Sequence, residues 1–217
     1  MKKILAKIVL AILLLCFVCL PVRAELITIA LTGKMYIVED SQHVFGGQIH
    51  YNDTITGTYT YDTSASDSEL SDPSVGDYWF YSTPCGASFT VNGFNFRTDP
   101  DNVLFSVGVV NNESALGDVY DFCSHNNLPL STGVSVNSIS WQITDSSKSA
   151  FSSDALPTTA PNLANFDMDY GLTIDGAGDN YFLLRADIIS AEVVPEPATL
   201  LLMVSGLLLL RKIKASR

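Results

Sequence analysis

Apolar and polar residues alternate along most of the middle of the chain, which is the pattern of half-buried β-strands. Residues 26–39 alternate in this way, with Gly33 interrupting the pattern as at a bulge or a turn. Residues 54–63 are β-branched and aromatic with a period of two. Four more strands are expected over residues 103–110, 134–144, 170–174 and 181–192.

Turn signals separate these segments. Within residues 88–97, Asn92-Gly93 stands between alternating aromatic residues, which predicts a two-residue hairpin. The Gly- and Asp-rich residues 175–180 predict a last hairpin near the end of the domain. Three stretches lack a strand pattern and are expected to be loops: residues 64–76, 111–118 and 145–165.

No sustained helical period occurs between the two ends of the chain. Turn signals recur roughly every 8–12 residues, which favours an all-β domain with a sandwich or jelly-roll architecture. We expect a single domain of this kind over residues 25–192, because that length suits one ordinary hydrophobic core.

The N-terminus has the organisation of a secretory signal peptide. Three lysines among the first seven residues precede an apolar run over residues 8–20, and Val22-Arg23-Ala24 fits a small-residue cleavage pattern. We therefore expect residues 1–24 to be removed and the mature chain to begin at Glu25.

The C-terminus combines a proline motif, an apolar run and a basic tail. Val194-Pro195-Glu196-Pro197 precedes the apolar residues 198–210, which four basic residues follow. The prolines keep the backbone extended, and the basic end is expected to stay cytoplasmic while the apolar run enters a bilayer. The run has 13 residues, whereas a full span needs about 20, so a terminal helix buried against the domain is the alternative.

The expected mature domain is strongly acidic. Residues 25–194 hold 22 acidic and 4 basic side chains, a formal charge of −18. This balance argues against a nucleic-acid partner, because binding nucleic acid needs Lys and Arg to displace counterions. It suits a soluble, mutually repelling surface and leaves divalent cations as a candidate ligand.

Two cysteines remain after removal of the signal peptide, Cys85 and Cys123. Pairs of cysteines in exported domains usually form a disulfide, which would stabilise this fold by roughly 3–4 kcal/mol. Two separate buried thiols are the alternative. Neither cysteine lies in a motif typical of redox catalysis or of zinc binding.

The residues do not predict an enzyme. The chain contains no GxSxG motif, and His43, His50 and His125 each stand alone in an ordinary segment. Glycoside hydrolysis needs two carboxylates across a cleft, and among 22 acids some pair always meets that requirement.

Calcium is the candidate inorganic ligand, and no other cofactor is expected. Asp62, Asp67, Glu69 and Asp72 crowd one predicted loop, and Ca²⁺ takes several oxygen ligands from flexible loops. The alternative is that these acids only solubilise the surface and stabilise turns.

Aromatic residues suggest a sugar-binding platform. Tyr59 and Tyr61 fall on one face of a predicted strand, and Trp79 and Tyr81 follow in an aromatic cluster. Exposed rings could stack on sugar rings, whereas the alternative is packing in the core, where aromatic residues are common.

The C-terminal segment resembles the PEP-CTERM sorting signal of Gram-negative bacteria, in which VPEPAT precedes a Gly-containing apolar helix and a basic cluster. Here VPEPAT covers residues 194–199, the glycine is Gly206, and the cluster begins at Arg211. Residues 55–62, ITGTYTYD, resemble a phrase that recurs in the ectodomains of such proteins.

The resemblance implies processing by an exosortase near the proline motif. The precursor would be held transiently in the inner membrane through residues 193–217, and the mature protein would reach the cell surface or the extracellular matrix. It also implies association with exopolysaccharide and biofilm. We therefore expect a non-enzymatic structural or adhesive protein, with a carbohydrate-binding module as the alternative.

Overall fold

The computed structural model describes residues 26–113 and 115–195. The predicted signal peptide, the mature start Glu25, and Glu196 to the end of the predicted membrane segment lie outside these described residues. Among the described residues, no helix is long and apolar enough to cross a membrane.

The described chain consists of β-strands with two short 3₁₀ turns. The strands are β1 (Leu26–Glu39), β2 (Thr54–Asp62), β3 (Val75–Phe80), β4 (Gly86–Val91), β5 (Phe94–Arg97), β6 (Phe105–Glu113), β7 (Gly117–Ser124), β8 (Val136–Asp145), β9 (Met168–Asp169), β10 (Leu172–Gly176) and β11 (Leu183–Val193). The 3₁₀ turns are η1 (Leu163–Asn165) and η2 (Gly178–Asn180). The all-β prediction is confirmed for this part of the chain.

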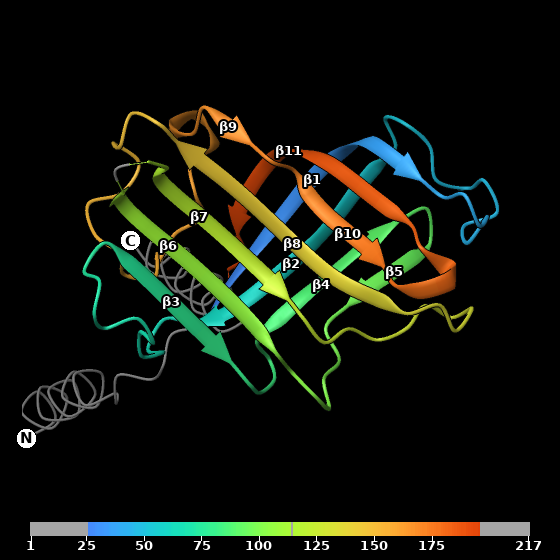
Figure 1. Ribbon diagram of the computed structural model, residues 1–217, viewed down its shortest axis with the longest axis horizontal. Helices are drawn as coiled ribbons and strands as arrows, with labels where there is room; N and C mark the ends of the chain where they lie inside the picture. The colour runs from blue at the N-terminus through green and yellow to red at the C-terminus, as the bar shows by residue number, and fades with distance from the viewer. Residues whose placement is uncertain (1–25, 114, 196–217) are drawn as a thin grey trace, which may run out of the picture.

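The strands form one antiparallel sheet in the order β3-β6-β7-β8-β10-β11-β1-β2-β4-β5, with β9 paired to β8. The sheet curls on itself, so that β6, β7 and β8 lie across β2 and β4 (Figure 1). Ring contacts join the two halves. The ring centroid of Phe122 in β7 lies 4.4 Å from that of Tyr59 in β2 and 6.2 Å from that of Phe89 in β4. The two facing layers are thus halves of one continuous curled sheet.

Two predicted details of the strands are confirmed. Asn92 and Gly93 connect β4 to β5 with φ of 46° and 87°, the left-handed values that a two-residue hairpin turn requires. In β1 the pairing with β11 shifts register between Thr32 and Gly33, so the predicted interruption is a bulge.

Strand β7 was not predicted, although it lies near the middle of one half of the sheet. Residues 111–118 were expected to form a loop, whereas β6 extends to Glu113 and β7 begins at Gly117. The alternation that could have identified the strand is present, because Tyr120 and Phe122 are buried and Asp121 and Cys123 are less so. The strand was missed because its first two residues, Gly117 and Asp118, have the composition of a turn.

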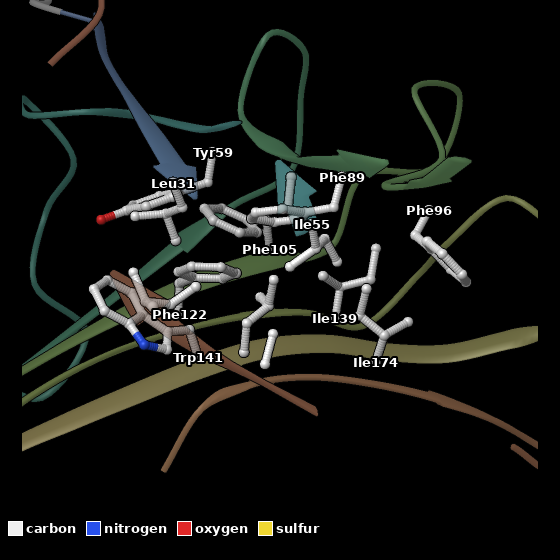
Figure 2. Close-up of a cluster of buried hydrophobic side chains, with 14 of the residues drawn as sticks. Leu31, Ile55, Tyr59, Phe89, Phe96, Phe105, Phe122, Ile139, Trp141 and Ile174 are labelled. Carbon is white, nitrogen blue, oxygen red and sulfur yellow. The ribbon is translucent and has the colours of Figure 1, made fainter. Parts of the chain in front are cut away.

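The core fills the space between the two halves of the sheet. Aromatic side chains are its largest members, and Trp141, Tyr59, Tyr120 and Phe122 are among the largest fully buried side chains. Figure 2 shows Tyr59, Phe122 and Trp141 converging, with aliphatic side chains, from opposite walls of the curl. Tyrosine and tryptophan can be buried here because their polar atoms find partners inside the protein.

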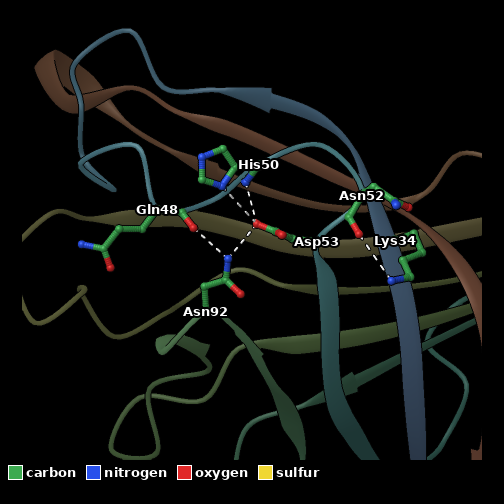
Figure 3. A network of polar contacts seen from close by, with 6 residues as sticks. All are labelled: Lys34, Gln48, His50, Asn52, Asp53 and Asn92. Carbon is green, nitrogen blue, oxygen red and sulfur yellow. Dashed lines mark hydrogen bonds and ion pairs between the residues drawn. The ribbon is translucent and has the colours of Figure 1, made fainter.

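Polar contacts attach the segment after β1 to the β4–β5 turn (Figure 3). The Asp53 carboxylate accepts hydrogen bonds from the His50 backbone N–H and from Asn92 Nδ2, both at 2.7 Å. The Asn92 amide also donates to the Gln48 carbonyl at 2.7 Å. These hydrogen bonds connect the loop to the β4–β5 turn, and the ring contact between Phe45 and Phe94 adds an apolar connection beside them.

Candidate functional site

The beginning of β1 and the end of β11 lie side by side in the middle of the sheet. Ile29 pairs with Val193, and the Val194 N–H donates a 2.8 Å hydrogen bond to the Thr28 carbonyl. The predicted sorting motif thus begins directly on a sheet strand, with no linker before it. Val194 and Pro195 are described, whereas Glu196 and Pro197 lie outside the described residues.

The disulfide predicted between Cys85 and Cys123 is absent, and both cysteines are free thiols. Cys85 lies in the buried cluster just before β4, beside Asp62. Cys123 lies on the other face of β7 from its buried neighbour Phe122, with its sulfur 3.7 Å from His125 Nδ1. The separation in sequence allowed pairing, but the two side chains face different surroundings.

The predicted aromatic platform also needs correction. Tyr59 and Tyr61 are completely buried, so their faces are not available to a ligand. Trp79 is half-buried on the opposite side of the sheet and stacks on His125 with ring centroids 5.2 Å apart, and Tyr81 is exposed beyond the end of β3. The four rings therefore do not share one surface.

The four acids proposed for calcium each serve a local turn. Asp62 and Asp72 accept hydrogen bonds from Ser64 and Ser74, two residues further along the chain. Asp67 accepts from the backbone of residues 69 and 77, and Glu69 accepts from the hydroxyl of residue 71. Within the described ranges, His, Cys, Asp and Glu side chains form no cluster of three or more that could hold a metal ion.

A cross-strand row of side chains runs over the face of the sheet turned away from the core, which we call the outer face. The register places its members opposite one another from β3 to β11: Trp79, Ser106, Cys123, Ser140, Thr173 and Arg185. A second row beside it consists of Asp77, Gly108, Asp121 and Gln142. Paired residues in antiparallel strands project to the same side, so both rows share this face.

A cavity of about 340 Å³ opens where these rows cross β7, β8 and β10. We call it the outer-face groove, and the side chains that define it are Asp121, Cys123, Ser140, Gln142, Tyr170 and Arg185. It offers charged and neutral hydrogen-bonding groups. It also contains the aromatic residue Tyr170, which is 52% exposed.

Two charged groups of opposite sign lie in the outer-face groove. Burial, and then the nearby charge of Asp77, raises the pKa of Asp121 to about 6. The Arg185 Nε is buried without an acceptor, and the described residues offer this guanidinium no carboxylate within ion-pair distance. Among the described residues, Arg185 therefore has no carboxylate partner, although the domain is strongly acidic.

The groove also contains a cysteine beside a histidine, the pair used by many nucleophilic enzymes. Here burial raises the pKa of Cys123 to about 11, and the charges of Asp121 and Asp175 add to that effect. A thiolate nucleophile needs the opposite environment, one that lowers the thiol pKa. The pair is therefore suited to packing and hydrogen bonding rather than to nucleophilic attack.

Sequence reasoning missed this groove because it depends on strand pairing. Asp121 and Cys123 belong to the unpredicted β7, and Arg185 is far from both along the chain. The alternation within each strand could have placed these residues on the polar face, but not beside each other.

No family model matches the chain, and neither a curated protein nor a solved structure matches it.

Proposed function

We propose that the protein is an exported, exosortase-processed component of the cell surface or extracellular matrix, with a structural or adhesive role. The observation that carries this proposal is the order of Val194-Pro195-Glu196-Pro197, an apolar run and a basic tail, at the opposite end from a signal peptide. The chain would be held in the inner membrane of a Gram-negative bacterium before release or attachment outside.

The position of the two chain ends supports this order of events. Because β1 begins beside the end of β11, both processing sites would lie at one end of the central strand pair. Removal of both terminal segments would leave the hydrogen-bonded strands between them unchanged. A sandwich-like ectodomain of two facing layers, without either terminal segment, would then be the mature product.

The acidic surface supports an extracellular rather than a nucleic-acid role, as its charge of −18 repels other anions and keeps copies apart. A non-enzymatic role fits the groove chemistry, in which the cysteine beside the histidine is held as a neutral thiol. Calcium is not part of the proposal, since each of the four candidate acids accepts hydrogen bonds from its own turn or the adjoining strand.

Replacement of the motif tests the proposal. In a host that expresses an exosortase, the full chain should be shortened at its C-terminus, whereas Pro195→Ala/Glu196→Ala/Pro197→Ala should stay at full length. Pro129→Ala, at an exposed proline outside the motif, is the matched control and should be processed normally. Equal shortening of the triple variant, or no shortening of the unaltered chain, would overturn the proposal.

A further inference from the structure

We propose that the outer-face groove binds a neutral glycan chain lying across the strands. The inference rests on the proposed location outside the cell, where a glycan would be the partner, and it assigns that partner to a surface.

The floor is shallow because small residues follow one another across it. Ser106, Cys123, Ser140 and Thr173 are consecutive members of the long row, and each projects little above the sheet. In the neighbouring row, Gly108 leaves its space to the Asp121 carboxylate, since a Cβ there would come within 2.7 Å of Oδ2. The result is a trough that runs perpendicular to the strands.

Aromatic residues stand at both ends of the trough. At the β3 end, Trp79 stacks on His125, whose ring nitrogens lie 3.3 Å from Ser106 Oγ and 3.7 Å from Cys123 Sγ. From Cys123 to Arg185, the part of the row that lines the cavity, the row crosses three strand spacings, about 14 Å in all. That length suits an extended chain ligand rather than a single small molecule.

A β-bulge forms the other end. Met35 pairs with Ala186 and Ile37 with Arg185, so Tyr36 is an extra residue in β1. Its ring lies over Gly171, where a Cβ would come within 2.8 Å of the hydroxyl, and that hydroxyl donates to the Tyr170 carbonyl at 3.2 Å. Bulges redirect side chains in this way beside functional sites, and here the bulge places the Tyr36 hydroxyl against the backbone of Tyr170.

The polar groups between these ends suit sugar hydroxyls. Arg185 only donates hydrogen bonds, ionised Asp121 only accepts them, and Gln142 does both. A hydroxyl both donates and accepts, so one sugar unit can satisfy several of these groups while its ring stacks on Tyr170. Arg185, whose Nε has no acceptor, would gain partners that the described protein does not supply.

Charge decides between neutral and acidic glycans. Asp77 lies near Asp121, and Asp175 projects from β10 near Cys123, so the groove and its surroundings hold three carboxylates against the single arginine. A uronic-acid chain would meet these groups and the overall acidic surface, which repels it. A neutral chain meets no such penalty.

Affinity electrophoresis of the full chain, purified in detergent, tests the inference. Gels would contain hydroxyethylcellulose, xylan, galactomannan or dextran as neutral probes, and polygalacturonate as the acidic probe. We expect at least one neutral probe to retard the protein and polygalacturonate to have no effect. Arg185→Ala should weaken that retardation at least tenfold, and Arg97→Ala, at an exposed arginine outside the groove, should leave it unchanged.

Ser140→Tyr, which fills the floor while keeping Arg185, should also abolish retardation, and thermal unfolding would show that each variant is folded. The inference is overturned if no neutral probe retards the protein, if polygalacturonate alone does, or if Arg97→Ala weakens retardation as much as Arg185→Ala. Retardation of a chain that no exosortase processes would contradict the proposed export while supporting the groove. If the chain is processed but no neutral probe retards it, the proposed export is supported and the groove inference is contradicted.

Discussion

The hydroxyl groups of Tyr59 and Tyr120 lie 3.0 Å apart in the interior and join β2 to β7 across the curl. Both side chains are completely buried, and burial raises the pKa of each well above its ordinary value. Each hydroxyl therefore stays neutral and depends on its hydrogen bonds to offset the loss of water.

Removing one hydroxyl of this pair should destabilise the protein more than its size suggests. Tyr59→Phe leaves the Tyr120 hydroxyl without that partner, which costs about 1–2 kcal/mol of unfolding free energy. Adding Tyr120→Phe should cost little more, because the unpaired group is then gone. Urea denaturation of both single variants and the double variant measures this, and strictly additive losses would contradict a direct pair.

Asp121 and Asp145 should respond in opposite ways to loss of charge. Because burial raises the Asp121 pKa from 3.8 to about 6, the folded state is penalised as pH rises through that window. Asp121→Asn should therefore stabilise the protein at pH 7, by up to about 3 kcal/mol, and should have little effect below about pH 4.

Asp145 is the matched comparison. Hydrogen bonds from Ser147 and Ser149 lower its pKa, so its stabilisation is present above the ordinary pKa and is lost as pH falls below it. Asp145→Asn should destabilise the protein at pH 7. Urea midpoints at pH 4 and pH 7 test both variants, and shifts of the same sign at pH 7 would contradict the assignment.

The two cysteines of the mature protein should be thiols. Burial raises the pKa of Cys85 and of Cys123 to about 11, so both should react slowly with an alkylating reagent at pH 8 while the protein is folded. After denaturation without reductant, two labels per chain are expected by mass spectrometry. If the denatured chain takes up no label, the two cysteines form a disulfide and this prediction is wrong.

Asp53 should control the segment between β1 and β2. Asp53→Ala removes the acceptor of the His50 N–H and of Asn92 Nδ2, which should cost about 1 kcal/mol and speed hydrogen exchange at the His50 amide. Asp179→Ala, at an exposed aspartate in η2, is the control and should change neither quantity. Unchanged exchange in Asp53→Ala would show that the loop is held by other contacts.

The strands were predictable where local pattern alone determines them. The alternation of β1 and the Asn92-Gly93 turn gave strand identity, a bulge and a hairpin without any tertiary information. It was harder to predict which face of a strand is buried. The alternation of Tyr59 and Tyr61 fits a buried face and an exposed face equally well. The opposing rings of Tyr120 and Phe122 show that the face is buried.

The outer-face groove was not predictable for a related reason. Trp79, Cys123 and Arg185 come together through a chain of strand pairings that no local pattern encodes. The distance between the two cysteines also depends on which face each occupies, and that depends on the missed strand β7. The proposed terminal signals rest on short linear motifs in the sequence, and almost all of their residues lie outside the described part of the chain.

The most direct test of the proposed function is the intact mass of the mature protein recovered from its native host. We predict a chain that lacks residues 1–24 and also lacks the segment after the Pro195-Glu196-Pro197 motif. A mass that retains residues 193–217 would contradict exosortase processing and would indicate a protein that keeps its C-terminal segment.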